Sequence, residues 1–166
     1  MERRTPRLVV TLVFAGLVVA LAAALVWIRI DLAAARTAAE EREAAMRAAA
    51  MHAVSLLSLN HKTVDEDIRR IIATSTGEAR QTHERHAPEM RRAALAAKVV
   101  QTGVIRAVGL VSMNAELDTA EVLVVADAVN RFEDTKPRFE ERYYRWTMRV
   151  SKVGGAWLVS KAEQTP

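Results

Sequence analysis

Cysteine is absent from this sequence of 166 residues, and several common enzyme motifs are absent with it. A chain without cysteine has no disulfide framework, no thiolate metal site and no cysteine nucleophile. The sequence also lacks G-x-G-x-x-G, the phosphate-binding P-loop, G-x-S-x-G and H-E-x-x-H, which mark four classes of catalytic or nucleotide site. We therefore predict a non-enzymatic protein with no cofactor, no catalytic residues and no metal site.

The sequence has little excess charge outside its first 30 residues. Lys and Arg number 24 against 20 Asp and Glu, a net charge of +4. Arg3, Arg4, Arg7 and Arg29 lie at the two ends of one apolar run, and residues 31–166 hold 20 basic and 19 acidic groups. A nucleic-acid-binding domain carries a basic patch. The near-neutral composition of residues 31–166 therefore predicts no nucleic-acid partner.

The apolar run, from Leu8 to Ile28, has 21 residues without a charge. As a helix with a rise of about 1.5 Å per residue, it spans the roughly 30 Å hydrocarbon core of a bilayer. Trp27 lies at its far edge, where an indole suits the headgroup layer. We predict a transmembrane helix over residues 8–30. Its anchoring residues are Leu8, Phe14, Leu17, Leu21, Trp27 and Ile28.

The orientation follows from the basic residues that precede the run. Arg3, Arg4 and Arg7 place residues 1–7 in the cytoplasm by the positive-inside rule, so residues 31–166 are exported. The alternative is a cleaved signal peptide, because the alanines of residues 20–24 resemble a cleavage site. The run exceeds the roughly 7 to 15 apolar residues of a signal peptide. A signal anchor is therefore preferred, with cleavage of residues 1–24 left open.

Residues 31–60 are typical of an extended helix, because 11 alanines lie between positions 33 and 53 and no Gly or Pro interrupts them. Its apolar stripe buries little area, so the segment is either a solvated stalk or a docking face for a partner helix. The stripe consists of Leu32, Ala35, Ala39, Met46, Ala49, Ala53, Leu56 and Leu57. The predicted partner face combines charges of this helix and of a later strand: Arg36, Glu43, Arg47, Arg145 and Arg149.

Two further helices are expected before residue 103. Thr63 and Glu66 form a capping-box pattern that predicts a helix over residues 64–73 with Val64, Ile68, Ile71 and Ile72 inward, closed by Gly77. Residues 78–101 are also helical in type and end at Gly103. Pro88 lacks an N–H, so it is expected to begin a new helix.

After Gly103 the pattern changes to that of strands. Residues 104–113, 120–131, 143–153 and 156–162 are rich in β-branched and aromatic residues. Gly154-Gly155 indicates a tight hairpin, residues 114–119 a first turn and residues 132–138 a longer loop. Helices followed by an antiparallel meander predict an α+β domain over residues 61–166, with helices on one face of a curved four-stranded sheet.

The helices offer two groups of candidate site residues. His83 and His86, with Glu84 and Glu89, offer a weak zinc pattern, but solvated surface histidines are preferred. The acidic triplet Asp65-Glu66-Asp67 could coordinate calcium, but we prefer the interpretation that its charges complement the positive end of the helix dipole.

The strand residues offer two further candidates. A basic run on the third strand could contact acidic partners or lipid headgroups, although a solvated charged face is preferred. Its members are Arg138, Arg142, Arg145, Arg149 and Lys152. Asp127 with Tyr143 or Tyr144 could serve an isomerase-like pocket if Asp127 points inward.

The order of these segments resembles the Mce-associated membrane proteins of actinobacteria. The resemblance rests on the segments T-V-D-E-D-I at residues 63–68, S-T-G-E at 75–78, W-T-M-R-V at 146–150 and K-V-G-G-A-W-L-V-S at 152–160. Relatives commonly place aromatics just before the first of these, where this chain has Leu59-Asn60-His61.

The resemblance implies an accessory subunit beside mammalian-cell-entry complexes, which move lipids or sterols through the cell envelope. It also implies a cone fold similar to nuclear transport factor 2 and to the bitopic scaffold subunits of type IV secretion. We therefore expect a membrane and protein subunits of a lipid-transport complex as partners. The alternatives are a secretion-system scaffold and an isomerase-like ligand-binding cone.

Overall fold

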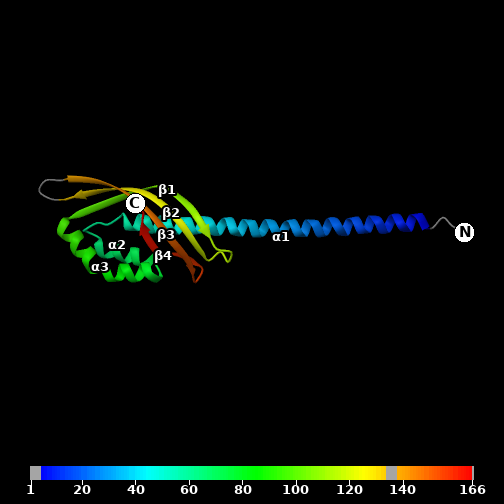
Figure 1. Ribbon diagram of the computed structural model, residues 1–166, viewed down its shortest axis with the longest axis horizontal. Helices are drawn as coiled ribbons and strands as arrows, with labels where there is room; N and C mark the ends of the chain where they lie inside the picture. The colour runs from blue at the N-terminus through cyan, green and yellow to red at the C-terminus, as the bar shows by residue number, and fades with distance from the viewer. Residues whose placement is uncertain (1–4, 134–137, 166) are drawn as a thin grey trace. The chain divides into compact units, whose positions relative to one another are not determined.

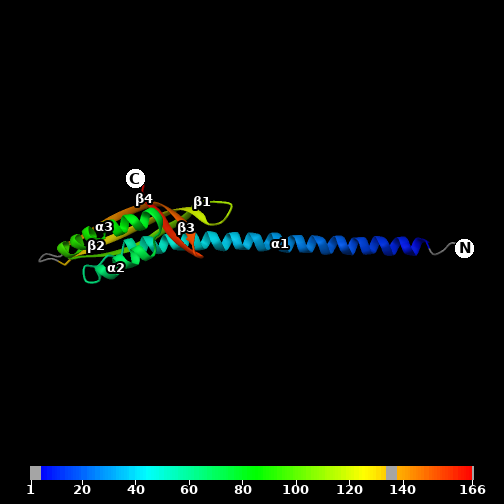
Figure 2. The same cartoon turned by 90° about the horizontal axis from the view of Figure 1, so that it is seen from below.

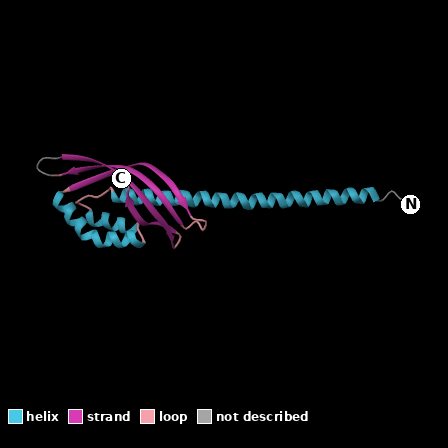
Figure 3. Ribbon diagram, viewed as in Figure 1, coloured by secondary structure: helices cyan, strands magenta, loops and turns pink. Residues whose placement is uncertain are grey.

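In the residues that the structure describes, three helices come first and four strands follow. Figure 3 colours the helices and the strands separately. The computed structural model describes the backbone of residues 5–133 and 138–165, and side chains from Val13 onward. The elements are α1 (Thr5–Leu56), α2 (Val64–Ala73), α3 (Gly77–Ala97), β1 (Val99–Met113), β2 (Thr119–Phe132), β3 (Arg138–Val153) and β4 (Ala156–Gln164).

The structure divides into two compact units between Glu40 and Glu41. The first unit is the N-terminal part of α1. The second unit holds the last part of α1 and every later element. Residues 41–56, which the sequence assigns to an extended helix, therefore belong to the folded domain.

The four strands form one antiparallel meander in the order β1-β2-β3-β4 (Figure 1). Alternate residues of β2 and β3 are buried, and the register pairs Val122 with Met148 and Val124 with Trp146. We call this the inner face of the sheet and the opposite side the outer face. The predicted alternation of β3 and the antiparallel meander are both confirmed.

Alanines of α1 pack on the inner face. Ala45, Ala49 and Ala53 are completely buried and belong to one hydrophobic cluster with Val124 and Val150. Their four-residue spacing puts them on one side of the helix. Small side chains bury little area each, but they let a helix approach a sheet closely. Ala49 and Ala53 belong to the predicted stripe, and their partner is the domain's own sheet. Ala45 is a further contact that the predicted stripe does not include.

Close approach is clearest at Gly103, on the inner face of β1. A Cβ atom built there would lie 2.3 Å from Cβ of Leu57. Leu57 itself is buried in the main cluster. Gly103 therefore serves as a contact point within a strand, and the prediction that it ends a helix is wrong.

In Figures 1 and 2, α2 and α3 pack against one another in the folded domain. They share a second, smaller hydrophobic cluster, in which Val64, Ile68 and Ala94 are buried. The predicted inward residues of α2 are confirmed, with Ile72 half-buried at the edge of this cluster.

The start of α2 differs from a capping box. Thr63 is the N-cap residue, but its hydroxyl donates to Oδ2 of Asp67 at 2.9 Å and makes no side-chain cap. The same Oδ2 accepts the backbone N–H of Asn60 at 3.0 Å, and Oδ1 accepts Arg70 at 3.1 Å. Asp67 is 3% exposed, so this carboxylate orders the turn before α2 from within the domain.

Three boundary predictions around α3 are wrong. Gly77 has a φ of +52°, yet it is the first residue of α3 and does not close α2. Pro88 lies inside α3, where it is exposed, so the carbonyl that loses its N–H donor can bind water. Lys98 ends α3 in the left-handed region with a φ of 45°, and β1 begins at Val99, so the predicted helix does not reach residue 101.

The turns between the strands agree better with the sequence-based predictions than the helix boundaries do. Gly154 and Gly155 have positive φ values of 57° and 84° and form the predicted hairpin. Asn114 organises the first turn, where its side-chain oxygen accepts the backbone N–H groups of Asp118 and Thr119. Residues 134–137 of the longer loop, Pro137 among them, lie outside the described residues.

Candidate functional site

The apolar part of α1 is exposed throughout the described residues. From Val13 onward the helix is long and apolar enough to cross a membrane, and none of its most apolar window is buried in the protein. Among the predicted anchors, Phe14, Leu17, Leu21, Trp27 and Ile28 are all more than half exposed. Leu8 and Arg7 lie in the part of α1 without described side chains, and Arg3 and Arg4 lie outside the described residues.

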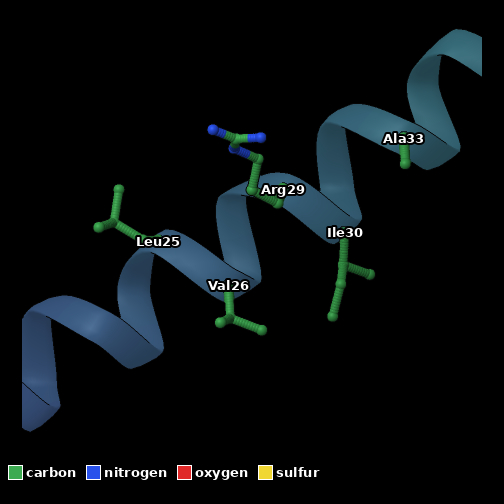
Figure 4. Close-up of a pocket in the computed structure, with 5 residues that line it drawn as sticks. All are labelled: Leu25, Val26, Arg29, Ile30 and Ala33. Carbon is green, nitrogen blue, oxygen red and sulfur yellow. The ribbon is translucent and has the colours of Figure 1, made fainter.

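The end of this segment holds a shallow hollow on one helix (Figure 4). Val26 and Ile30 point to one side of the helix, and Arg29 points to the other. One helix cannot enclose a ligand, so this hollow is surface that lipid tails or another helix would cover.

Within the folded domain, the residues of the predicted partner face come from two places, α1 and the outer face of β3. Arg47 Nη2 binds Oε1 of Glu43 at 2.8 Å on an exposed side of α1. Arg145 and Arg149 extend from β3 on the outer face, away from the inner face on which α1 packs. Arg36 belongs to the other compact unit.

A groove lies beside Arg47, between α1 and the β3–β4 hairpin. It has a volume of about 320 Å³. Met51 on its α1 side is 58% exposed, although it is an apolar side chain. The residues along the groove are Ala44, Arg47, Ala48, Met51, Thr74, Gly155, Trp157 and Leu158. We call this set the α1–β4 groove.

Glu41 fixes one end of the groove. Its Oε2 accepts Nε1 of Trp157 at 2.7 Å, and its Oε1 accepts Nζ of Lys152 at 2.5 Å. The hydrogen bond from Lys152, followed by that from Trp157, lowers the pKa of the Glu41 carboxyl. The prediction missed this contact. The four-residue spacing from Glu41 to the buried alanines is the signal that places it on the sheet-facing side.

The outer face of the sheet carries charges paired with one another. Arg106 Nε lies 2.6 Å from Oδ2 of Asp127, and the Tyr143 hydroxyl donates to Glu141 at 3.2 Å. Tyr144 instead faces inward and stacks on Trp146 with ring centroids 4.8 Å apart. Asp127 therefore points outward, on the side of the sheet opposite Tyr144. Its register partner Tyr143 is on the same outer face but is 73% exposed, so neither tyrosine gives Asp127 the apolar pocket that an isomerase-like site needs.

The histidines separate into different environments. His86 is exposed, and its Nδ1 binds the carbonyl of Thr82 within α3 at 2.9 Å. His83 is half-buried against the fully buried ring of His52, with ring centroids 5.3 Å apart. Solvated surface histidines are therefore a wrong prediction for His83. Over residues 5–133 and 138–165, no group of three or more His, Asp or Glu side chains is arranged to hold a metal.

The pKa values of both imidazoles are lowered from that of a free histidine. Burial, followed by the charge of His83, lowers the pKa of His52 from 6.5 to about 3. Burial, followed by the charge of His86, lowers the pKa of His83. Both rings are therefore neutral at neutral pH.

The described residues thus combine a folded domain with one exposed apolar helix. The model of the family "Uncharacterized protein Rv1363c/MT1408-like" matches residues 5–166, and the chain belongs to this family. A relative described as "Uncharacterized protein Rv1363c", from Mycobacterium tuberculosis, is 30% identical over 131 residues, or 78% of the chain. The chain spans about half the length of that relative, 49%.

Solved structures of low identity share the fold. The periplasmic domain of DotI matches with a TM-score of 0.57 at 15% identity, covering 73% of this chain and 92% of DotI. The Agrobacterium tumefaciens VirB8 protein matches at 0.57 and 11% identity, covering 76% and 92%. CagV, a VirB8 homolog of T4SS from Helicobacter pylori, matches at 0.56 and 11%, covering 70% and 93%. The predicted fold class, helices on a curved four-stranded antiparallel sheet, is confirmed.

Proposed function

We propose that the protein is a bitopic, non-catalytic scaffold subunit of a protein assembly in the cell envelope. The observation that carries the proposal is the combination of an exposed apolar helix with a folded domain of the VirB8 and DotI type. CagV, which has the same fold, is described as a VirB8 homolog of a type IV secretion system. A secretion-type assembly is therefore the first candidate.

A second candidate is an accessory subunit of a mammalian-cell-entry lipid-import complex. It is favoured by the sequence resemblance of residues 63–68, 75–78 and 146–160 to Mce-associated membrane proteins. Both candidates assign the same task to the chain: α1 anchors it, and the domain binds another subunit. The two candidates differ in the assembly to which that subunit belongs, a secretion system or a lipid-import complex.

The proposed orientation places the N-terminus in the cytoplasm and the folded domain outside. Arg3, Arg4 and Arg7 support it through the positive-inside rule.

The proposed partner surface is the α1–β4 groove, and its proposed occupant is an amphipathic helix of a neighbouring subunit. Along α1, partly buried Ala44 and Ala48 are four residues apart and exposed Met51 follows three residues later, so they give an apolar strip on one helix face. Such a strip receives apolar anchors from a second helix. The Glu43–Arg47 pair supplies a polar rim.

Deletion of the gene, followed by quantitative mass spectrometry of the membrane fraction, tests the proposal. We expect subunits of one envelope assembly to fall in abundance and to recover when the gene is restored. Loss of a secretion ATPase and its channel subunits supports the first candidate, and loss of lipid-import permeases supports the second. Unchanged envelope assemblies contradict both.

A further inference from the structure

His52 and His83 form a buried contact between elements far apart in the sequence. His52 comes from the end of α1 and is 0% exposed, and His83 comes from the middle of α3. Their ring centroids are 5.3 Å apart, with planes inclined at 49°. The Nε2 atoms of both rings are buried without a hydrogen-bond partner.

The hydrogen bonds around Thr74 define the state of His52. The Thr74 hydroxyl has one hydrogen, which it directs to the carbonyls of Arg70 and Ile71. It therefore accepts from Nδ1–H of His52 at 2.8 Å. The Nε2 atom of His52 is left with a free lone pair beside His83.

The residues around Thr74 connect this contact to the sheet. The backbone N–H of Val159 in β4 donates to the Thr74 carbonyl at 3.1 Å, and Thr76 donates to the Val159 carbonyl at 2.8 Å. His52 thus binds the segment between α2 and α3 at the point where that segment meets β4.

We call α2, α3 and the segment between them the α2–α3 hairpin. Apart from the histidine contact, this hairpin has its own hydrophobic cluster. Val64, Ile68 and Ala94 pack with Met90 and Val99, away from the main core. Among buried residues of the hairpin, Ala79 belongs to the main core cluster. A change at the two histidines therefore acts where the hairpin joins the rest of the domain.

We propose that the His52–His83 contact is an acid-sensitive joint whose protonation releases the α2–α3 hairpin from α1 and β4. A protonated His52 has a second N–H, on Nε2, with no acceptor in its buried site. If both rings are protonated, two positive charges lie 5.3 Å apart, one on the fully buried His52 and one on the half-buried His83. Opening exposes the rings and hydrates them.

The surrounding charges do not neutralise the joint. Glu78 of α3 and Lys161 of β4 line a cavity of about 60 Å³ beside His83, and Lys161 is bound by Glu163 of the same strand. On α2, Arg70 pairs with Asp67, and on α3 the nearby charge is His86. In the described part of the chain, no carboxylate hydrogen-bonds to either ring.

The direction of the pH effect follows from these environments. In the closed form His52 stays neutral down to a pKa of about 3, whereas an exposed imidazole binds a proton near 6.5. The closed form is therefore most stable above about pH 6.5 and loses stability as the pH falls from there towards 3. At pH 4.5, His52 alone favours opening about 100-fold more than at pH 7.5.

Hydrogen–deuterium exchange of the full-length protein in nanodiscs measures this opening. After correction for the intrinsic pH dependence of exchange, we expect opening at residues 77–97 to increase about 100-fold or more between pH 7.5 and 4.5. The double variant H52N/H83N, whose amides do not titrate, is expected to change less than 10-fold. H86N, which removes the exposed histidine near His83 but leaves the buried ring of His52 in place, is the control, and we expect it to keep most of the wild-type acid response.

Three results would overturn the joint. The first is an equal acid response in H52N/H83N, and the second is no acid response in the wild type. The third is opening of β2 to the same extent as α3, which is global unfolding. If the double variant does not fold, an NMR titration of wild-type His52 decides: a neutral ring below pH 5 supports the joint, and protonation near pH 6.5 contradicts it.

Discussion

At the scale of single residues, small side chains set the distance between α1 and the sheet. Ala45, Ala49 and Ala53 are completely buried, and Gly103 meets Leu57 with no room for a methyl group. In a closely packed protein interior, adding or removing a single carbon atom changes the stability of the fold. The alanines at positions 45, 49 and 53 are therefore a packing feature of the folded domain.

The substitution Gly103→Ala tests this packing. The added Cβ would lie 2.3 Å from Leu57, so the helix end or the strand must move. We expect the free energy of unfolding to fall by about 1–3 kcal/mol, measured by chemical denaturation. Gly109→Ala is the matched control, because nothing lies within 4 Å of its added Cβ. Equal stability of the two variants would show that the close approach is absent.

At the scale of elements, strands and helix faces could be predicted from the sequence, whereas several boundaries could not. The alternation of Tyr144, Trp146, Met148 and Val150 places β3 because a sheet has one buried face. The end of α3 carries no such signal. It depends on Lys98 adopting a left-handed conformation that is usual for glycine, and on β1 pairing from Val99 onward.

Lys98→Gly tests the account of this boundary. A left-handed backbone costs a side-chain-bearing residue about 1–2 kcal/mol, and glycine adopts it freely. We therefore expect Lys98→Gly to raise the free energy of unfolding by about 1 kcal/mol. Lys98→Ala keeps the Cβ and serves as the control, with little expected change. If glycine destabilises the domain relative to alanine, the left-handed helix end is incorrect.

The candidate site could be predicted only in part, because most of its contacts join residues that are far apart in the sequence. Glu43 and Arg47 share a helix face by spacing, and the structure brings them together. Trp157 and Glu41 are 116 positions apart, so nothing local in the sequence pairs them. The burial of His52 likewise depends on α3, which packs beside it. Contacts of this kind become visible only after the elements assemble.

At the scale of the whole molecule, the chain combines an apolar helix with a domain that presents a groove. The absence of cysteine makes its topology directly measurable, since each introduced cysteine is unique. We expect Glu2→Cys to react with a membrane-impermeant maleimide only after the cytoplasmic membrane is permeabilised. Val111→Cys, at an exposed position of β1, should react in spheroplasts whose cytoplasmic membrane is intact. The reverse pattern contradicts the proposed orientation.

Capture of the full-length protein from crosslinked cells of its own organism tests the central claim, that the domain binds a neighbouring envelope subunit through the α1–β4 groove. We predict that wild type and Val111→Lys retain the same membrane-bound partner, confirmed by reciprocal capture. Met51→Lys, which puts a charge in the groove, should reduce that partner about tenfold or more. Unchanged capture by Met51→Lys, or a wild-type chain that captures no envelope protein, would contradict the account.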